Sequence, residues 1–320
     1  MKKGVKIVLL IGILLLAFGL TALQFAHHRG EVSYGGFADM TSFGSSSGFG
    51  YDQKGYTVLT GGEESFSAKD VNALDLDWIS GSVNVERWDG KDVVVREKAA
   101  SELSEDQSLR WKLSGGKLMI LPCANNARNL PDKQLSILIP QGLTLDGVSI
   151  DSASASVLVS ALEVKGTIDL DAASGSLRIE DCVCGELDLD SASGSQSILR
   201  SSVSGKAEAD LASGSFTAEL LECAKLDVDG ASGAVRAEGL RCRSVDIDTA
   251  SGEVSLGFDA APEKVDVSTV SGAVTLSFPK GAGIDVDFDT ASGKLSGEIV
   301  YGSVPVEVDT VSGSLTIEYK

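Results

Sequence analysis

The sequence predicts an all-β protein: a right-handed parallel β-helix, or β-solenoid, of about 20 residues per turn, with an irregular β cap and one N-terminal transmembrane helix. Three observations predict it. A phrase ending in Ser-Gly returns about every 20 residues, apolar and acidic residues alternate within that phrase, and a long apolar run lies near Met1. In chain order we expect a membrane anchor at 1–29, a Gly/Ser-rich flexible linker at 30–68, the irregular β cap at 69–142 and a solenoid of about nine turns at 143–320.

The N-terminal segment has the pattern of an uncleaved anchor. Lys2, Lys3 and Lys6 precede an apolar run from Ile7 to Ala26. At ~1.5 Å per residue this run spans a ~30 Å hydrocarbon core. It ends in Leu-Gln-Phe-Ala, not in a small-x-small cleavage site. We therefore expect a single-pass protein of the cell membrane that contacts the lipid bilayer through residues 7–26, with its N-terminus cytoplasmic and the bulk of the chain extracytoplasmic. A long cleaved signal peptide is the alternative.

Two further segments precede the regular repeats. Residues 30–68 are rich in Gly, Ser and single aromatics without a sustained period, which indicates a flexible tether or, alternatively, an interaction segment. The unit Leu74–Val85 carries the repeat phrase once, but Ser80 precedes Ser154 by 74 residues, which is not a whole number of turns. We therefore expect an irregular, partly antiparallel cap that covers the first edge of the stack, or else a separate small domain.

The repeat itself continues to the end of the chain. Its corner serines are Ser154, Ser174, Ser193, Ser213, Ser232, Ser251, Ser271, Ser292 and Ser312. The residues six and four positions before each serine are apolar, and the positions between and after them are mostly acidic. This period of two predicts strands with one buried face, and parallel crossovers are right-handed in about 98% of cases.

The Ser-Gly corners have a structural explanation. Glycine tolerates positive φ, and a serine hydroxyl can bond nearby backbone. A row of nucleophilic serines would need a base, and the two histidines, His27 and His28, both lie beside the apolar run. The sequence therefore predicts no enzyme and no catalytic residues.

A resemblance to a known family rests on Leu-Ser-Ile-Leu-Ile-Pro-Gln-Gly at 135–142 and on the hydrophobic-Asp-hydrophobic-Asp-x-Ala-Ser-Gly repeats that follow. Over about residues 70–320 the chain resembles the putative-adhesin β-strand-repeat family of bacterial envelope proteins, a domain of largely unknown function. The resemblance implies a β-solenoid exposed at the cell envelope, in some cases tied to envelope-stress sensing, and it supplies no catalytic residues.

Acidic residues form the candidate binding feature. The net charge is −19, from 46 acids and 27 bases, which excludes nucleic acid as a partner of the soluble part. Carboxylates recur three and five residues before the serines, as a stripe that either is a solvated, aggregation-resistant face or binds a divalent cation, chiefly calcium, or a basic partner. The candidate cation stripe comprises Asp169, Asp171, Asp188, Asp190, Asp227, Asp229, Asp246 and Asp248. No dedicated metal site and no cofactor is predicted, with Ca²⁺ kept as the alternative.

Two smaller features complete the expectations. Cys184, Cys223 and Cys242 fall ten residues after their corner serines, so we expect a core column of free thiols. The last strand, 314–319, runs to the end of the sequence and should expose an unpaired edge at the C-terminal rung. That edge would support edge-to-edge self-association or capture of a partner strand.

The functional prediction is a membrane-anchored, extracytoplasmic β-solenoid that acts as a non-catalytic, adhesin-like binding module or as a scaffold at the bacterial cell envelope. Its expected partner is an envelope protein or a polysaccharide. The alternatives are an envelope-stress sensor or regulatory protein, and a β-helix carbohydrate-active enzyme that would use pairs of these carboxylates.

Overall fold

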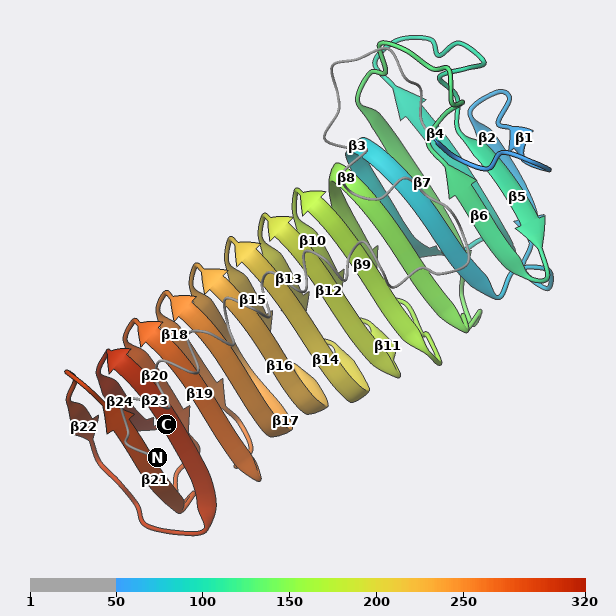
Figure 1. The fold of residues 1–320 in the computed structure, drawn as a ribbon. Helices are drawn as coiled ribbons and strands as arrows, with labels where there is room; N and C mark the ends of the chain where they lie inside the picture. Colours follow the sequence, from blue (N-terminus) through green and yellow to red (C-terminus); the bar gives the residue numbers. More distant parts are fainter. Residues whose placement is uncertain (1–49) are drawn as a thin grey trace.

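The computed structural model describes residues 50–320, which form one sheet of 24 strands without a helix in this part of the chain. Figure 1 shows an elongated stack of rungs with a broader cap at one end. The predicted anchor at 7–26 lies outside the described residues. Within 50–320, no helical segment reaches the length and apolar character needed to cross a bilayer.

The predicted stack is confirmed by its register. Strands β9 (Thr167–Ser174), β12 (Glu186–Ser193) and β14 (Ser202–Ser213) pair in parallel, and Ser193 lies opposite both Ser174 and Ser213. The same order continues through β16 (Glu222–Ser232), β17 (Val235–Ser251) and β19 (Lys264–Ser271). The second strands of these rungs also pair in parallel; they are β10 (Leu177–Glu180), β11 (Val183–Cys184), β13 (Gln196–Leu199), β15 (Phe216–Glu219), β18 (Val254–Phe258) and β20 (Val274–Phe278). The right-handed winding stays a prediction.

The interior of the stack is filled by the apolar columns that the sequence predicts. Ile168, Leu187 and Leu226, for example, are at most 1% exposed. Near the C-terminal end the rings of Phe258 and Phe278 stack with their centroids 5.1 Å apart. Equivalent side chains of successive rungs thus form one continuous core.

The Ser-Gly corners hold consecutive rungs close together. Gly194 and Gly233 have φ values of 141° and 123°, and a Cβ there would lie 1.7 and 1.5 Å from the carbonyl oxygen of the glycine one rung earlier. The serine hydroxyl also serves this contact, since Ser193 Oγ donates to Ala173 O at 3.4 Å on the preceding rung. The corner therefore needs glycine for its φ and for the close approach, while serine adds a bond between rungs.

A second corner column has no signature in the sequence. Ala161, Asp181, Arg200 and Leu220 all take positive φ, between 47° and 55°, and Gly239 continues the column at 70°. Non-glycine residues rarely adopt this conformation, so each such corner stores strain.

At the N-terminal end, one rung is inserted between two that come later in the chain. Strand β3 (Ala73–Trp88) pairs in parallel with β8 (Gly147–Ser160) on one side, and Ser80 lies opposite Ser154. On its other side β3 pairs in parallel with β6 (Lys117–Leu121) and β7 (Lys133–Pro140). The Leu74–Val85 unit is therefore a full rung, and the boundary predicted at 142/143 is wrong because the parallel stack starts at Ala73.

The cap beyond this rung is partly antiparallel, as predicted. Strand β4 (Asp92–Ala99) pairs antiparallel with β7, and β5 (Arg110–Ser114) pairs antiparallel with β6. Two further strands, β1 (Thr57–Val58) and β2 (Glu63–Ser67), pair with β5 and β4. The linker predicted at 30–68 is therefore wrong for its second half, because Phe66 packs into the cap core against Trp111.

Arg87 holds the segment that connects β7 of the cap to β8 of the stack. Arg87 of β3 donates from Nη1 to Pro140 O and Leu143 O, both at 2.6 Å, and from Nε to Ala161 O at 3.0 Å. These carbonyls belong to the crossing from β7 to β8 and to the next corner. The charged donor thus satisfies backbone where the chain passes over β3.

At the C-terminal end the order of the last two rungs is reversed. Strands β23 (Val304–Ser312) and β24 (Leu315–Tyr319) lie between β19–β20 on one side and β21 (Ile284–Thr290) with β22 (Leu295–Gly297) on the other. The predicted unpaired edge at 314–319 is therefore wrong, because β24 is paired on both sides. The open edge belongs to β21 and β22.

Candidate binding surface

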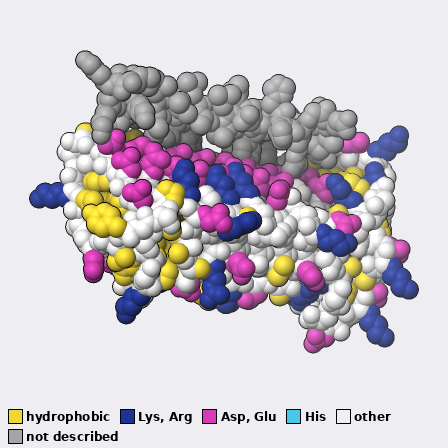
Figure 2. All heavy atoms as spheres, turned by 90° about the horizontal axis from the view of Figure 1, so that it is seen from below, with side chains coloured by type: hydrophobic (Ala, Val, Ile, Leu, Met, Phe, Trp, Pro, Cys, Tyr) yellow, Lys and Arg dark blue, Asp and Glu magenta, His cyan; other side chains and the backbone are white. Residues whose placement is uncertain are grey.

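Two acidic columns run along one outer face of the solenoid. The first comprises Asp169, Asp188, Glu208, Asp227, Asp246 and Asp266, and the second comprises Asp171, Asp190, Asp210, Asp229 and Asp248. Members of each column lie opposite one another on consecutive strands. Figure 2 shows acidic side chains gathered in a band along the molecule. All eight residues of the predicted cation stripe lie in these columns.

Lysines of the same face neutralise part of the first acidic column. Lys206 Nζ lies 2.8 Å from Glu208 and 2.7 Å from Asp227, and Lys225 Nζ lies 2.9 Å from Asp227 and 3.0 Å from Asp246. Partial burial opposes ionisation of Asp227, but bonds from both ammonium groups hold its pKa below the ordinary value. At Asp227 and Asp246 the chain thus supplies its own counter-cation.

The second acidic column is charged differently. Burial, followed by repulsion from Asp151, Asp169 and Asp190, raises the pKa of Asp171 to about 9. Burial and the carboxylates of Asp190 and Asp229 raise the pKa of Asp210 to about 8. Asp171 and Asp210 therefore keep protons at neutral pH, which lowers the repulsion that stacked carboxylates would otherwise cause.

These shifts extend to the neighbouring positions. Burial and like charges raise the pKa of Asp190 to about 7 and that of Asp188 to about 6. No lysine is paired with Asp188 or Asp190 among the described residues. At neutral pH Asp188 is mostly ionised, whereas Asp190 is protonated for part of the time, so a proton there reduces the repulsion as Lys206 and Lys225 do at Asp227. The face thus has two parts. The lysine-neutralised segment comprises Asp227 and Asp246, and the proton-holding segment comprises Asp171, Asp190 and Asp210.

A metal site is not preformed on this face. Residues 50–320 contain no group of three or more carboxylate, histidine or cysteine side chains arranged to hold a metal ion. From β9 to β17 each rung contributes one carboxylate to each column, so the carboxylates form rows along the stack. Calcium binding by the predicted stripe stays a prediction, and it concerns the proton-holding segment more than Asp227 and Asp246.

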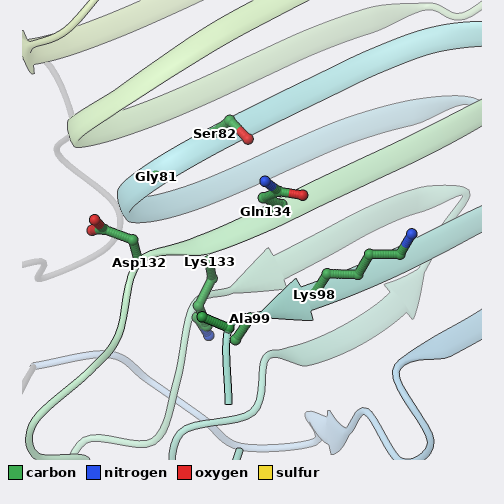
Figure 3. Close-up of a pocket in the computed structure, with 8 residues that line it drawn as sticks. Gly81, Ser82, Lys98, Ala99, Asp132, Lys133 and Gln134 are labelled. Carbon is green, nitrogen blue, oxygen red and sulfur yellow. The ribbon is translucent and has the colours of Figure 1, made fainter. Parts of the chain in front are cut away.

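One pocket lies in the cap and offers little chemistry. It has a volume of about 590 Å³ and lies where β7 begins beside β3 and the end of β4 (Figure 3). Gly81, Ser82 and Ala99 line much of it. Lys133 extends from its wall into the interior, where its ammonium group pairs with Glu97 at 2.5 Å and lies 4.9 Å from the Trp78 ring. Because this ammonium group is committed to a buried ion pair, the outer face is the better candidate for binding.

The cysteines lie where the sequence places them. Cys184, Cys223 and Cys242 share one buried column with Val203, and all five cysteines are free thiols in the structure. Burial raises the pKa of Cys184 to about 12, so this thiol stays protonated and unreactive at neutral pH.

The lysine column is the feature of this face that sequence reasoning missed. Lys206, Lys225 and Lys264 each stand seven residues before a corner serine, so the same alignment that reveals the carboxylates also reveals them. Lys264 pairs with Asp266 at 2.8 Å. The bridges between rungs, in contrast, depend on the register.

Comparisons with known proteins agree with this architecture. A family model described as Toastrack DUF4097 matches residues 204–320. No curated protein sequence matches the chain. A solved structure shares the fold at low identity. A putative adhesin from Parabacteroides distasonis is 16% identical with a TM-score of 0.54, over 81% of this chain and 96% of that one.

Two further solved structures are less similar. A putative adhesin from Bacteroides fragilis is 12% identical with a TM-score of 0.43, over 81% of this chain and 96% of that one. A putative lipid binding protein from Parabacteroides distasonis is 15% identical with a TM-score of 0.37, over 82% and 98% of the two chains. The structure of the putative adhesin from Parabacteroides distasonis and the family model agree with the fold described above. The chain carries a Toastrack match over residues 204–320, and its predicted resemblance to the putative-adhesin β-strand repeats is confirmed.

Proposed function

We propose that this protein is a non-catalytic, adhesin-like binding or scaffold module at the bacterial cell envelope, held in the membrane by residues 7–26 with the solenoid outside the cytoplasm. The observation that supports the proposal is the separation of apolar and charged side chains in the stack. The interior is filled with apolar side chains, while the charged residues form continuous columns on the outside. Such an object presents a long, rigid surface.

The resemblance to adhesin-named proteins supports this role. The structure from Parabacteroides distasonis with the shared fold is named a putative adhesin. The acidic face favours a partner that brings positive charge, either a basic segment of an envelope protein or a polysaccharide bridged by divalent cations. Of the two segments of that face, the proton-holding one changes its charge with pH, so it is the part whose affinity should depend on the conditions at the cell surface.

Membrane fractionation tests the location. We expect the full-length protein, produced in cells without an outer membrane, to stay in the membrane pellet after an alkaline carbonate wash. Its exposed lysines should react with a membrane-impermeant biotin ester in intact cells. Leu15→Arg is the matched variant, since a central arginine costs about 2.5–3.5 kcal/mol on insertion and should empty the pellet. Full-length protein in the soluble fraction, or labelled only after lysis, would contradict the proposal.

A turnover assay tests the absence of catalysis. The full-length protein should release no reducing ends from polygalacturonate or amylose, with or without calcium. Release that is abolished by Asp188→Asn together with Asp190→Asn would move the protein into the carbohydrate-active class.

A further inference from the structure

Among the described residues, the rung of β21 and β22 at the C-terminal end of the solenoid has one side on which no further strand pairs. Val286, Phe288 and Leu295 of the outer rung are half-buried or exposed. Their neighbours in register on β23 and β24, Val308 and Leu315, are fully buried. Three of the five exposed large hydrophobic side chains of the described residues, Leu295, Val300 and Tyr301, lie on this rung or on the loop after it. The core is therefore uncovered at this end.

The backbone of β21 shows which groups face outward. Asp285 lies opposite Pro305, which has no N–H to donate, so Asp285 and Asp287 exchange the ladder bonds with β23. Successive residues of a strand point their backbone groups to opposite sides. The N–H and C=O groups of Val286 and Phe288 therefore face the open side. No described strand pairs with them there.

The chain itself demonstrates that this side accepts a strand. Ile284 N–H donates to Val300 O at 2.8 Å, and Ile284 C=O accepts from Gly302 N at 3.0 Å, so Tyr301 forms a parallel bridge with Ile284. This short contact ends before Val286. Tyr301, which is 86% exposed, stands at the point where a longer strand would continue.

The acidic residues along the open edge of β21 favour a partner strand that carries basic side chains. The exposed Asp285 and Asp287 flank the open core position of Val286, and the outward Glu307 lies opposite Asp287 on the next strand. A second copy of this chain would place the same carboxylates opposite each other, at about 0.9 kcal/mol of repulsion per pair at 4.8 Å in water. A strand with lysine or arginine at alternate positions would pair with them. Lys294 is the one exposed base on β22 and its turn.

We propose that the open edge of β21 binds an extended segment of a partner protein in which apolar residues alternate with lysine or arginine, as an added parallel strand. The apolar side chains would cover Val286 and Phe288, and the basic ones would face Asp285 and Asp287. The proposal deepens the binding role given above and rests on it, and it assigns that role to one edge.

A peptide-binding assay tests the proposal. The probe is a fluorescein-labelled Val-Lys-Val-Lys-Val-Lys-Val peptide, compared with Val-Glu-Val-Glu-Val-Glu-Val, and the measurement is fluorescence anisotropy with the full-length protein. We expect the lysine peptide to bind at least tenfold more tightly than the glutamate peptide. N-methylation of alternate residues on its pairing side should abolish the binding, because it removes the backbone donors.

Three variants locate the site. Val286→Pro removes an outward donor and leaves the bonds of Asp285 and Asp287 to β23, so it should weaken binding at least tenfold at an unchanged melting temperature. Asp285→Lys with Asp287→Lys should reverse the preference between the two peptides, and this pair carries the test if Val286→Pro lowers the melting temperature. Asp89→Lys, at an exposed turn of the opposite end, should change nothing.

Each other outcome overturns the proposal. Equal binding of both peptides, no binding of either, or insensitivity to Val286→Pro and to the charge reversal excludes this edge as the site. A concentration-dependent dimer in light scattering that Val286→Pro abolishes identifies a second copy as the occupant. None of these results bears on the membrane location or on the absence of catalysis, which the experiments of the preceding section decide separately.

Discussion

The two ends of the solenoid share one topological device and differ in how they are closed. At the N-terminal end β3 lies between β6–β7 and β8, and at the C-terminal end β23–β24 lies between β19–β20 and β21–β22. In both places the chain passes over a rung and so holds the terminal layers together. Only the N-terminal end then adds antiparallel strands, whereas the C-terminal end exposes the side of its last rung. Interleaving secures an end against fraying, but it does not cover the core.

The largest expected effect concerns the closed end. Lys133→Ala leaves the carboxylate of Glu97, which is 2% exposed at its side chain, without its ion pair, so we expect a loss of about 3–5 kcal/mol in the free energy of unfolding. Urea denaturation followed by tryptophan fluorescence measures it, since Trp78 lies beside this ammonium group. Lys98→Ala, an exposed lysine one strand away, is the control and should cost less than about 0.5 kcal/mol. Equal losses would show that the buried pair does not hold the cap.

The second prediction compares two phenylalanines near the open end. Phe278 is fully buried and stacks on Phe258, so Phe278→Ala should cost about 3–4 kcal/mol. Phe288 is half-buried on the outer rung, so Phe288→Ala should cost about 1 kcal/mol. Chemical denaturation of both variants measures the difference. Similar losses would mean that the outer rung is covered in solution, and that the end is not open.

The third prediction separates the middle of the stack from both ends by pH. The raised pKa values of Asp171, Asp210 and Asp190, about 9, 8 and 7, mean that the folded state binds protons that the unfolded state has released. Their contribution to stability is complete below about pH 4, the unfolded-state value, and is lost progressively as the pH rises from there through the folded-state values of about 7 to 9. The melting temperature should therefore be higher at pH 5.5 than at pH 9.

A substitution assigns this pH dependence to the second acidic column. Asp210→Asn removes one carboxylate from the row and should raise stability at pH 9 by about 1 kcal/mol, the repulsion of one adjacent pair. Asp89→Asn, at the exposed turn of the cap, should have no such effect. If the melting temperature instead falls on acidification from pH 9 to 5.5, the column is ionised throughout and our account of it is wrong.

The smallest expected effect concerns the second corner column in mid-stack. Leu220 has a φ of 53° and is 56% exposed, so Leu220→Gly relieves a strained conformation and removes a side chain that is more exposed than buried. We expect a gain of about 0.5–1 kcal/mol in the free energy of unfolding. Thr217→Gly, on the adjacent regular strand β15, is the control and should destabilise by a similar amount. A loss on Leu220→Gly would show that this corner is not strained.

The sequence predicts the repeating part of the fold because each rung repeats the same physical requirement. Apolar columns, acidic columns and Ser-Gly corners follow from residues whose spacing is visible without a structure. The end rungs could not be placed in this way. Ser292 and Ser312 have the same surroundings as the other corner serines, so nothing local indicates that their rungs exchange places, and neighbours in sequence usually pair. The segment 50–68 lacks a period because β1 and β2 are short edge strands of the cap.

The sequence predicts which residues form the candidate surface, but it does not predict which of their carboxyl groups are ionised. Spacing alone identifies Asp171, Asp190 and their equivalents. The state of each carboxyl group depends on burial and on which lysine reaches across a rung, as Lys206 reaches Asp227. Such contacts exist only in the folded register, and therefore protonation had to be found in the structure.

The reversed order of the last two rungs has a consequence for synthesis. Residues 284–297 leave the ribosome before residues 304–319, yet β21 and β22 pair only with β23 and β24. The earlier segment therefore has no template until residues 304–319 have also left the ribosome. The turns from β9 to β19, in contrast, can be added one by one behind the emerging chain. Deletion of β23 and β24 would therefore also remove the pairing partners of β21 and β22, so that two turns are lost for the removal of one.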